Sequence, residues 1–160
     1  MSYDSFLELD GIEGESADSQ HADSIEVVSW SWGASNSGSM HEGKGGGAGK
    51  ASFQDITVTK YVDKATPALW QMVATGKHVA SGTLTMRKSG GDPLDYLKVE
   101  LEEILVSSIS NQGATGQDRL TENVTLNFAK FKLIYTPQEA DGTAGAEVEY
   151  GYNIREHVAA

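Results

Sequence analysis

The sequence predicts a mainly β protein, an antiparallel β-barrel or a pair of curved sheets, with long bulged strands, one short helix and a long glycine-rich loop. Apolar and polar residues alternate with a period of two through most of the chain, which is typical of strands that bury one face. In three long runs this alternation changes phase midway, and the bulges that such changes indicate bend a sheet towards closure. The 160 residues fit one domain, which we expect to span residues 1–160.

The N-terminal half contains four of the predicted strands. A short strand covers residues 6–9. A longer strand begins at Ile25 and changes phase between Val27 and Val28, where we expect a bulge. Two further strands are predicted at residues 53–61 and 78–88.

Two long strands in the C-terminal half change phase in the same way. Their inward residues are, in the first, Leu97, Val99 and Leu101 followed by Ile104 and Val106, and in the second, Val124, Leu126 and Phe128 followed by Phe131, Leu133 and Tyr135. A last strand is predicted at residues 147–155. Turn residues separate the strands at 89–92, 111–116 and 141–142.

One segment has the pattern of a helix. Thr66 is the expected N-cap, Pro67 takes the first helical position and Gly76 ends the helix. Its apolar face is formed by Leu69, Met72 and Val73. A single short helix beside so many strands is expected to cover an open edge or end of the sheet.

The glycine-rich loop, residues 33–50, first suggests a phosphate-binding loop because it ends in Gly49-Lys50. A phosphate loop requires glycine, four residues, Gly-Lys and then serine or threonine. Here Lys44 stands at the first glycine position and Ala51 at the last position. The residues that follow have the pattern of a strand rather than of the helix that would hold the anion. The spacing therefore argues against nucleotide binding.

Composition argues against several other classes of partner. With 23 acidic and 12 basic residues, the formal net charge is −11, which repels nucleic acid and anionic membrane surfaces. No segment approaches the roughly 20 apolar residues of a membrane span. The N-terminal residues lack the basic start and apolar stretch of a cleavable signal peptide, which favours a cytoplasmic protein.

We expect no catalytic, cofactor-binding or metal-binding residues. The chain has no cysteine, and the four histidines lack metal-ligand spacing, so surface or turn positions are expected for them: His21, His41, His78 and His157. A carboxylate pair for glycoside hydrolysis is conceivable among the acids of one strand, but a wet acidic strand face explains them better: Glu100, Glu102 and Glu103. The sequence thus predicts a protein that is not an enzyme.

A set of fragments, in order along the whole chain, resembles the Hcp family, the haemolysin-coregulated proteins of bacterial type VI secretion. The fragments are Trp30-Ser31-Trp32-Gly33, the glycine run 45–50, residues 59–64 followed by Thr66-Pro67, residues 76–78, 105–108 and 118–128, and residues 150–155. Each fragment alone is weak. Their common order over a chain of the family's length makes the resemblance specific.

The resemblance implies a barrel of two curved sheets that assembles into homohexameric rings. Stacked rings would form the inner tube of a contractile machine, inside a sheath, with a spike protein at the tip and effectors in the lumen. It implies no enzymatic activity and no cofactor. It also implies a protein that is cytoplasmic until it is secreted without a signal peptide and becomes extracellular.

Within this picture, two parts of the region 29–50 take different roles. Trp30 and Trp32 share one face of a strand and are expected in the core, so Ser31 points the other way and is a candidate lumen or effector contact. The glycine loop lacks bulky side chains and is expected to reach a neighbouring subunit. Its candidate contact residues are Gly43, Lys44, Gly45, Gly46, Gly47, Gly49 and Lys50.

Two alternatives remain open at the level of sequence. A tail tube protein of a phage or phage-like particle would share the ring but not the secretion, and fold alone does not separate it from Hcp. A monomeric ligand-binding β-barrel is the second alternative. An enclosed apolar pocket and a monomeric mass would favour it.

Overall fold

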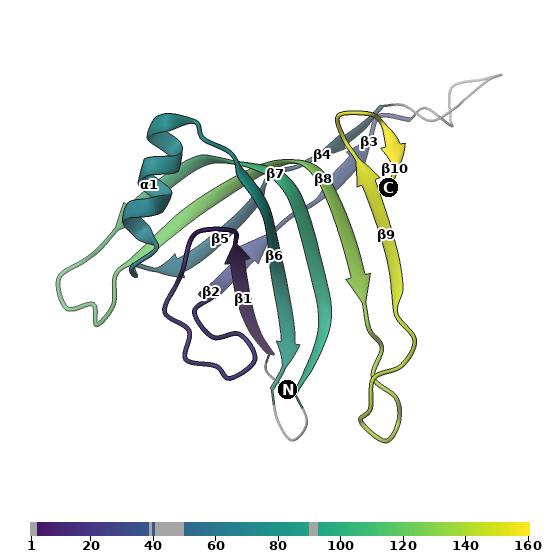
Figure 1. Cartoon of the computed structure of the whole chain (residues 1–160), viewed down its shortest axis with the longest axis horizontal. Helices are drawn as coiled ribbons and strands as arrows, with labels where there is room; N and C mark the ends of the chain where they lie inside the picture. Colours follow the sequence, from purple (N-terminus) through teal and green to yellow (C-terminus); the bar gives the residue numbers. More distant parts are fainter. Residues whose placement is uncertain (1–2, 39, 41–49, 90–92) are drawn as a thin grey trace.

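The computed structural model describes residues 3–38, 40, 50–89 and 93–160. Six antiparallel strands close into a barrel in the order β8-β5-β2-β1-β6-β7, and β7 pairs with β8 to complete the circle. Two further strands, β9 and β10, extend the sheet beyond β8, and β3 and β4 form a separate hairpin that projects from the barrel (Figure 1). The mainly β barrel expected from the sequence is therefore confirmed.

The strand and helix bounds follow the predicted elements with a few differences. The elements are β1 Tyr3–Leu9, β2 Ile25–Ser31, β3 Ala34–Asn36, β4 Ala51–Phe53, β5 Ile56–Tyr61, α1 Thr66–Thr75, β6 Val79–Lys88, β7 Leu94–Gln112, β8 Thr121–Tyr135, β9 Val148–Asn153 and β10 Val158–Ala159. The single strand predicted at 53–61 is wrong, because the chain leaves the hairpin after Phe53 and enters the barrel at Ile56. The backbone N–H of Gln54 donates to the carbonyl of Gly33 at 2.9 Å, which closes the base of the hairpin.

The core fills the inside of the barrel. Alternate residues of each strand point inward and are almost completely buried, among them Leu7, Ile25, Val58, Leu84, Val99, Leu101, Ile104, Val124 and Leu126. A six-stranded barrel has only enough interior for side chains, so these residues leave no channel through one chain.

The phase changes have two different structural origins. In β2 the pairing with β5 shifts between Val27 and Ser29, which confirms the predicted bulge. In β7 and β8 the buried face changes between Leu101 and Ile104 and between Phe128 and Phe131, although the register between the strands stays constant there. Glu103, at the turning point, has a positive φ of 53°. At this residue the inward and outward faces of β7 and β8 exchange together. A shift in the register between the two strands follows only between Val106 and Ser108.

Helix α1 lies at one end of the barrel and packs against β7 (Figure 1). Its end is as predicted, with Gly76 at φ 67° and its N–H donating to the carbonyl of Met72 at 2.9 Å. The predicted N-cap is wrong: Ala65 occupies that position, and Thr66 is the first helical residue. Leu69 is fully buried, whereas Val73, predicted on the same face, is exposed.

Candidate functional site

An uncharged polar surface covers the outer side of β2, β5, β8 and β7. Register pairing aligns its side chains in two rows across the strands, so we name it the hydroxyl face; the rows are Ser29, Thr59, Asn123 and Ser110, and Ser31, Thr57, Thr125 and Ser108. Thr59 Oγ1 donates to Asn123 Oδ1 at 2.7 Å, and the Oγ1 atoms of Thr57 and Thr125 lie 3.4 Å apart. The face offers many hydrogen-bond donors and acceptors without a formal charge.

Alternation along β2 places the residues of the predicted Trp-Ser-Trp motif as expected. Trp30 and Trp32 are partly buried and pack against the core. The ring of Trp32 meets Phe128 and Phe131 edge-on, with ring centroids 6.0 and 5.0 Å apart. Ser31 is exposed on the hydroxyl face, opposite Thr57 of β5.

The acid at the margin of the hydroxyl face is tied to neutral partners. Asp55 lies just before β5 and accepts a hydrogen bond from Asn127 Nδ2 at 2.8 Å. Its second oxygen accepts from Ser107 Oγ at 3.4 Å. The polar network of the face therefore continues across the bend between β4 and β5.

A buried ion pair lies directly behind the hydroxyl face. Lys60 and Glu122 are both 0% exposed, and Lys60 Nζ donates to Glu122 Oε1 at 2.9 Å, to Asp63 Oδ1 at 2.9 Å and to the carbonyl of Tyr61 at 2.8 Å. Thr66 Oγ1 also donates to Glu122 Oε1, which ties the start of α1 to the barrel. The pair was not predicted, although both residues occupy inward positions of their strands: Lys60 in phase with Val58, and Glu122 with Val124.

The other end of β7 and β8 carries exposed charge. Lys130 Nζ lies 3.4 Å from Glu102, Lys132 Nζ lies 3.3 Å from Glu149 on β9, and Arg155 pairs with Glu103. Glu100 faces Lys132 across the strands. We name this surface the charge ladder; its members are Glu100, Glu102, Glu103, Lys130, Lys132, Glu149 and Arg155. The wet acidic strand face expected from the sequence is thus balanced by bases from the neighbouring strands.

One histidine departs from its predicted surface position. His21 is buried, its ring stacks on Phe6 with centroids 4.6 Å apart, and its nitrogens lie 3.3 Å from Glu8 Oε1 and 3.1 Å from Asp95 Oδ1. These contacts attach the segment between β1 and β2 to the barrel. Across the described ranges, no group of three or more histidines, cysteines or carboxylates could hold a metal ion.

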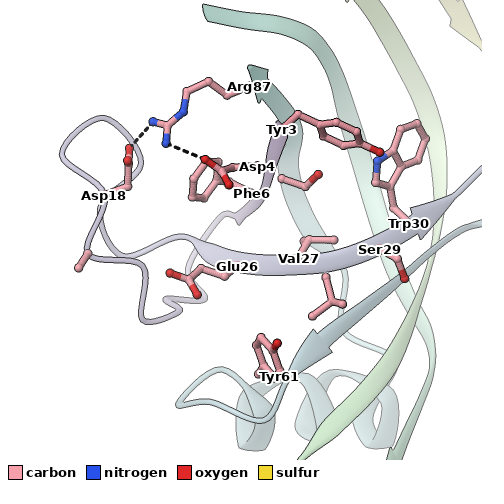
Figure 2. Close-up of a pocket in the computed structure, with 13 residues that line it drawn as sticks. Tyr3, Asp4, Phe6, Asp18, Glu26, Val27, Ser29, Trp30, Tyr61 and Arg87 are labelled. Atoms are coloured by element: carbon pink, nitrogen blue, oxygen red, sulfur yellow. Dashed lines mark hydrogen bonds and ion pairs between the residues drawn. The ribbon is translucent and has the colours of Figure 1, made fainter. Parts of the chain in front are cut away.

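A groove of about 630 Å³ opens where β1 and β2 part (Figure 2). Their pairing ends at Ser5 and Val27. Arg87, largely buried on β6, donates to Asp18 Oδ2 at 2.7 Å and to Asp4 Oδ2 at 3.4 Å along one wall. The hydrogen bond from Arg87 lowers the pKa of Asp18 to about 2, and the same bond raises the pKa of Arg87.

The predicted subunit-contact loop falls almost entirely outside the described residues. Six of its seven candidate contact residues lie outside the described residues: Gly43, Lys44, Gly45, Gly46, Gly47 and Gly49. Lys50 is described and exposed, directly before β4. The hairpin β3–β4, paired from Ala34 with Phe53 to Asn36 with Ala51, leads the chain away from the barrel towards this loop.

Helix α1 is the only helix of the part of the chain that the structure describes, and no helix there is long and apolar enough to cross a membrane.

Comparison with known proteins gives one consistent family. A family model described as "Type VI secretion system effector, Hcp" matches residues 6–135. The relative "Protein hcp1" of Pseudomonas aeruginosa is 52% identical over 162 residues, with all of both chains covered.

Solved structures agree with the sequence matches. A chain described as a type six secretion system protein superposes with a TM-score of 0.95 at 30% identity, covering 99% of this chain and 100% of the other. Hcp1 from Salmonella typhimurium superposes with a TM-score of 0.81 at 34% identity, with both chains covered completely.

Proposed function

Because the chain belongs to the Hcp family of type VI secretion system proteins, we propose that it is a structural tube component rather than an enzyme. In this proposal residues 1–160 act as one barrel domain, six copies form a ring, and stacked rings form the inner tube. The tube lies inside a contractile sheath, carries a spike protein at its tip and holds effectors in its lumen. The protein is cytoplasmic until the same system secretes it.

The hydroxyl face is the observation that carries this proposal. Each chain has a formal net charge of −11, so copies arranged around one axis repel one another wherever charged faces approach. The hydroxyl face spans four strands without a formal charge in either row. A surface of this kind suits the wall of a shared channel, because cargo meets hydrogen-bonding groups there but no fixed charge. We therefore assign this face to the lumen.

The apolar side of β9 supports the assembly of several copies. Val148 is 65% exposed and Tyr150 is 54% exposed, and Tyr135 of the neighbouring strand adds to the same patch. Exposed apolar residues on the outermost long strand of a sheet favour contact with another chain. We place the contact between ring neighbours at this patch.

The glycine-rich loop, residues 33–50, is our candidate for a segment that reaches out and contacts a neighbouring copy. Deleting residues 43–49 should lower the mass of the assembly in light scattering, because the segment that reaches the next copy is lost. Hexamers and tubes of unchanged mass would rule out this role for the loop.

Electron microscopy of the purified protein tests the assembly itself. We expect uniform rings with a wide central hole, and Tyr150→Lys should reduce their number because it places a cation in the apolar patch. Glu149→Lys is the matched control, since Glu149 belongs to the charge ladder on the other face of β9 and its change should leave the rings intact. Monomers at every concentration would contradict the proposal and would favour the monomeric ligand-binding barrel.

Ser31 tests the assignment of the lumen. Replacing Ser31 with tryptophan should impair retention of effectors while the rings remain intact, since the side chain points away from the core. Unchanged retention of every effector would count against this role. The other alternative, a phage tail tube protein, is disfavoured because the family match is to type VI secretion and extends over most of the chain.

A further inference from the structure

Tyr3 and Tyr96 bring two phenol rings together across strand β6. Their ring centroids lie 6.3 Å apart, and the ring planes meet edge to face at 85°. Tyr3 begins β1 and Tyr96 belongs to β7, and β6 lies between these strands and pairs with both (Figure 1). Among the described residues this is the only ring contact between two tyrosines. Two residues far apart in the sequence therefore form one pair of phenols.

A β-bulge aims Tyr96 at this contact. The register between β6 and β7 shifts between Met86 and Arg87, and Tyr96 is the residue of β7 that is left without a register partner on β6 there. The N–H of Thr136 donates to the carbonyl of Tyr96 at 2.8 Å, which fixes the bulged backbone. A bulge re-aims the side chain of its extra residue. The direction of the Tyr96 ring is therefore set by the sheet.

The surroundings of Tyr96 keep its ring oriented and its phenol neutral. Lys88 Nζ lies 5.3 Å from the centroid of the Tyr96 ring, which orients the ring by a cation–π contact. Burial raises the pKa of Tyr96, and the phenols of Tyr3 and Tyr135 raise it further. Tyr96 is partly buried, whereas Tyr3 is 53% exposed, so reagents in solution reach the pair from the side of Tyr3.

This pair of rings has the geometry for a covalent bond between phenols. The chain has no cysteine, so no thiol competes for an oxidant. We propose that Tyr3 and Tyr96 form an oxidative cross-linking site, at which a haem peroxidase with hydrogen peroxide joins the two rings as dityrosine.

The reaction balances without any further reagent. The peroxidase removes one electron and one proton from each phenol, and the two phenoxyl radicals form a carbon–carbon bond between ring positions next to the oxygens. The hydrogen on each bonded carbon then moves to the oxygen of its own ring, which restores both phenols. The chain loses two hydrogen atoms in all, and one hydrogen peroxide is reduced to two waters.

Proximity favours a link within one chain. Two radicals held side by side couple at an effective concentration that separate molecules do not reach in dilute solution. At Tyr3, β1 pairs with β6 but not yet with β2, so the link would tie this end of β1 to β7 as well. It would also close a covalent loop from residue 3 to residue 96, which restricts the unfolded chain as a disulfide does. Oxidised protein should therefore unfold at a higher urea concentration. The site does not depend on the proposed assembly, because both tyrosines belong to one chain.

Peptide mapping tests the site in the full-length protein. The tryptic peptides 1–44 and 89–98 contain one tyrosine each, Tyr3 and Tyr96, so a joined pair of these peptides identifies the link. In dilute wild-type protein treated with peroxidase and hydrogen peroxide, we expect the joined pair, dityrosine fluorescence and the loss of two hydrogen atoms from the cross-linked peptides. Oxidation in urea should lower the yield of the pair about tenfold or more, because unfolding separates the rings.

Single substitutions show which phenols take part. Tyr3→Phe and Tyr96→Phe should each abolish the joined pair, since phenylalanine has no O–H to lose. Tyr135→Phe is the matched control, because Tyr135 is nearly as exposed as Tyr3, at 46% and 53%, and it should keep the pair at full yield. Circular dichroism checks that each variant is folded. The proposal is overturned if folded wild type gives no joined pair, if the yield is the same in urea, or if dityrosine joins other residues or separate chains instead.

Discussion

The charged side chains of strand β8 point inward at one end of the strand and outward at the other. At the Thr121 end its outer residues belong to the hydroxyl face, and the acid of this half, Glu122, points inward to Lys60. At the Tyr135 end, Lys130 and Lys132 point outward into the charge ladder and remain solvent-accessible. The same strand thus removes charge from one outer surface and displays it on another.

The difference shows that the hydroxyl face is a property of backbone direction as well as of composition. The faces exchange at Glu103 of β7 and beside Ala129 of β8, where both strands twist over without losing register. On one side of this point an inward charge must find a buried partner, and on the other side an outward charge needs none. Buried and exposed pairs should therefore differ strongly in their contribution to stability.

A third ion pair falls between these extremes. Side-chain exposure is 0% and 0% for Lys60 and Glu122, and 39% and 57% for Lys130 and Glu102. Arg87 and Asp18, at the groove, are 10% and 23% exposed. The three pairs form a series in burial, which ranks the effects of breaking them.

Breaking the buried pair should have the largest effect. Lys60→Ala leaves Glu122 and Asp63 buried beside a cavity and without their cation, which costs about 3–5 kcal/mol of the free energy of unfolding. Urea denaturation measures this loss. The apolar pair Lys60→Met with Glu122→Leu should recover part of it, because Glu122 then leaves no buried charge, whereas Asp63 still lacks its cation and keeps only the hydrogen bond from the N–H of Ala65.

A loss below about 1 kcal/mol for Lys60→Ala would remove the contrast between the two ends of β8. A small loss would mean that water solvates Glu122 when Lys60 is absent. The uncharged character of the hydroxyl face would then not depend on the ion pair between Lys60 and Glu122.

The turning point at Glu103 should give the next largest effect. Left-handed backbone costs a non-glycine residue about 1–2 kcal/mol, so Glu103→Gly should be more stable than Glu103→Ala by about that amount. Both variants lose the ion pair with Arg155, so their difference isolates the backbone. Thermal or urea unfolding distinguishes them, and the opposite order, which is usual within strands, would show that the twist does not depend on φ at this residue.

The pair at the groove should reveal itself through pH. In the folded protein the pKa of Asp18 is lowered from its ordinary value of 3.8 to about 2. Ionised Asp18 therefore stabilises the folded protein at any pH above 3.8, and this contribution is lost as the pH falls towards 2. Asp18→Asn removes the ionisation. The difference in unfolding free energy between wild type and variant should therefore be largest near neutral pH and shrink between pH 4 and pH 2. A constant difference over this range would show that Arg87 does not hold Asp18 in its charged form.

The charge ladder should give the smallest effect. A double-mutant cycle of Glu102→Ala and Lys130→Ala should yield a coupling of about 0–1 kcal/mol, because both groups are hydrated. The coupling should fall further in about 1 M salt, where screening reaches over only ~3 Å. A coupling free energy that persisted in high salt would show that Glu102 and Lys130 are shielded from solvent ions, as the buried pair of Lys60 and Glu122 is.

Much of the barrel was predictable because burial acts through local alternation. The bulge of β2, the two changes of face and the end of α1 at Gly76 each have a signal within a few residues. The division of residues 53–61 into two strands had none, since it depends on the hydrogen bond that Gln54 makes with Gly33 far along the chain. Position in the fold, rather than propensity, decided it.

The site was predictable only in part. Alternation placed Ser31 opposite the tryptophans, and the same rule applied to Lys60 and Glu122 would have predicted both as inward. The other rows of the hydroxyl face depend on which strands become neighbours. The groove depends on where β1 leaves β2 and on Arg87, which meets acids 69 and 83 positions away. Sequence periodicity contains no information on contacts between residues so far apart in the chain.

The short pairing of β1 with β2 has a consequence for how the barrel comes apart. These strands share register only from Ser5 to Leu7, whereas β7 and β8 stay paired over almost their full length. Local opening begins where the fewest backbone hydrogen bonds must break together. Those amide hydrogens of Ser5–Leu7 that donate to β2 should therefore exchange with deuterium before those of the β7–β8 ladder, as the cylinder opens into a curved sheet along this line.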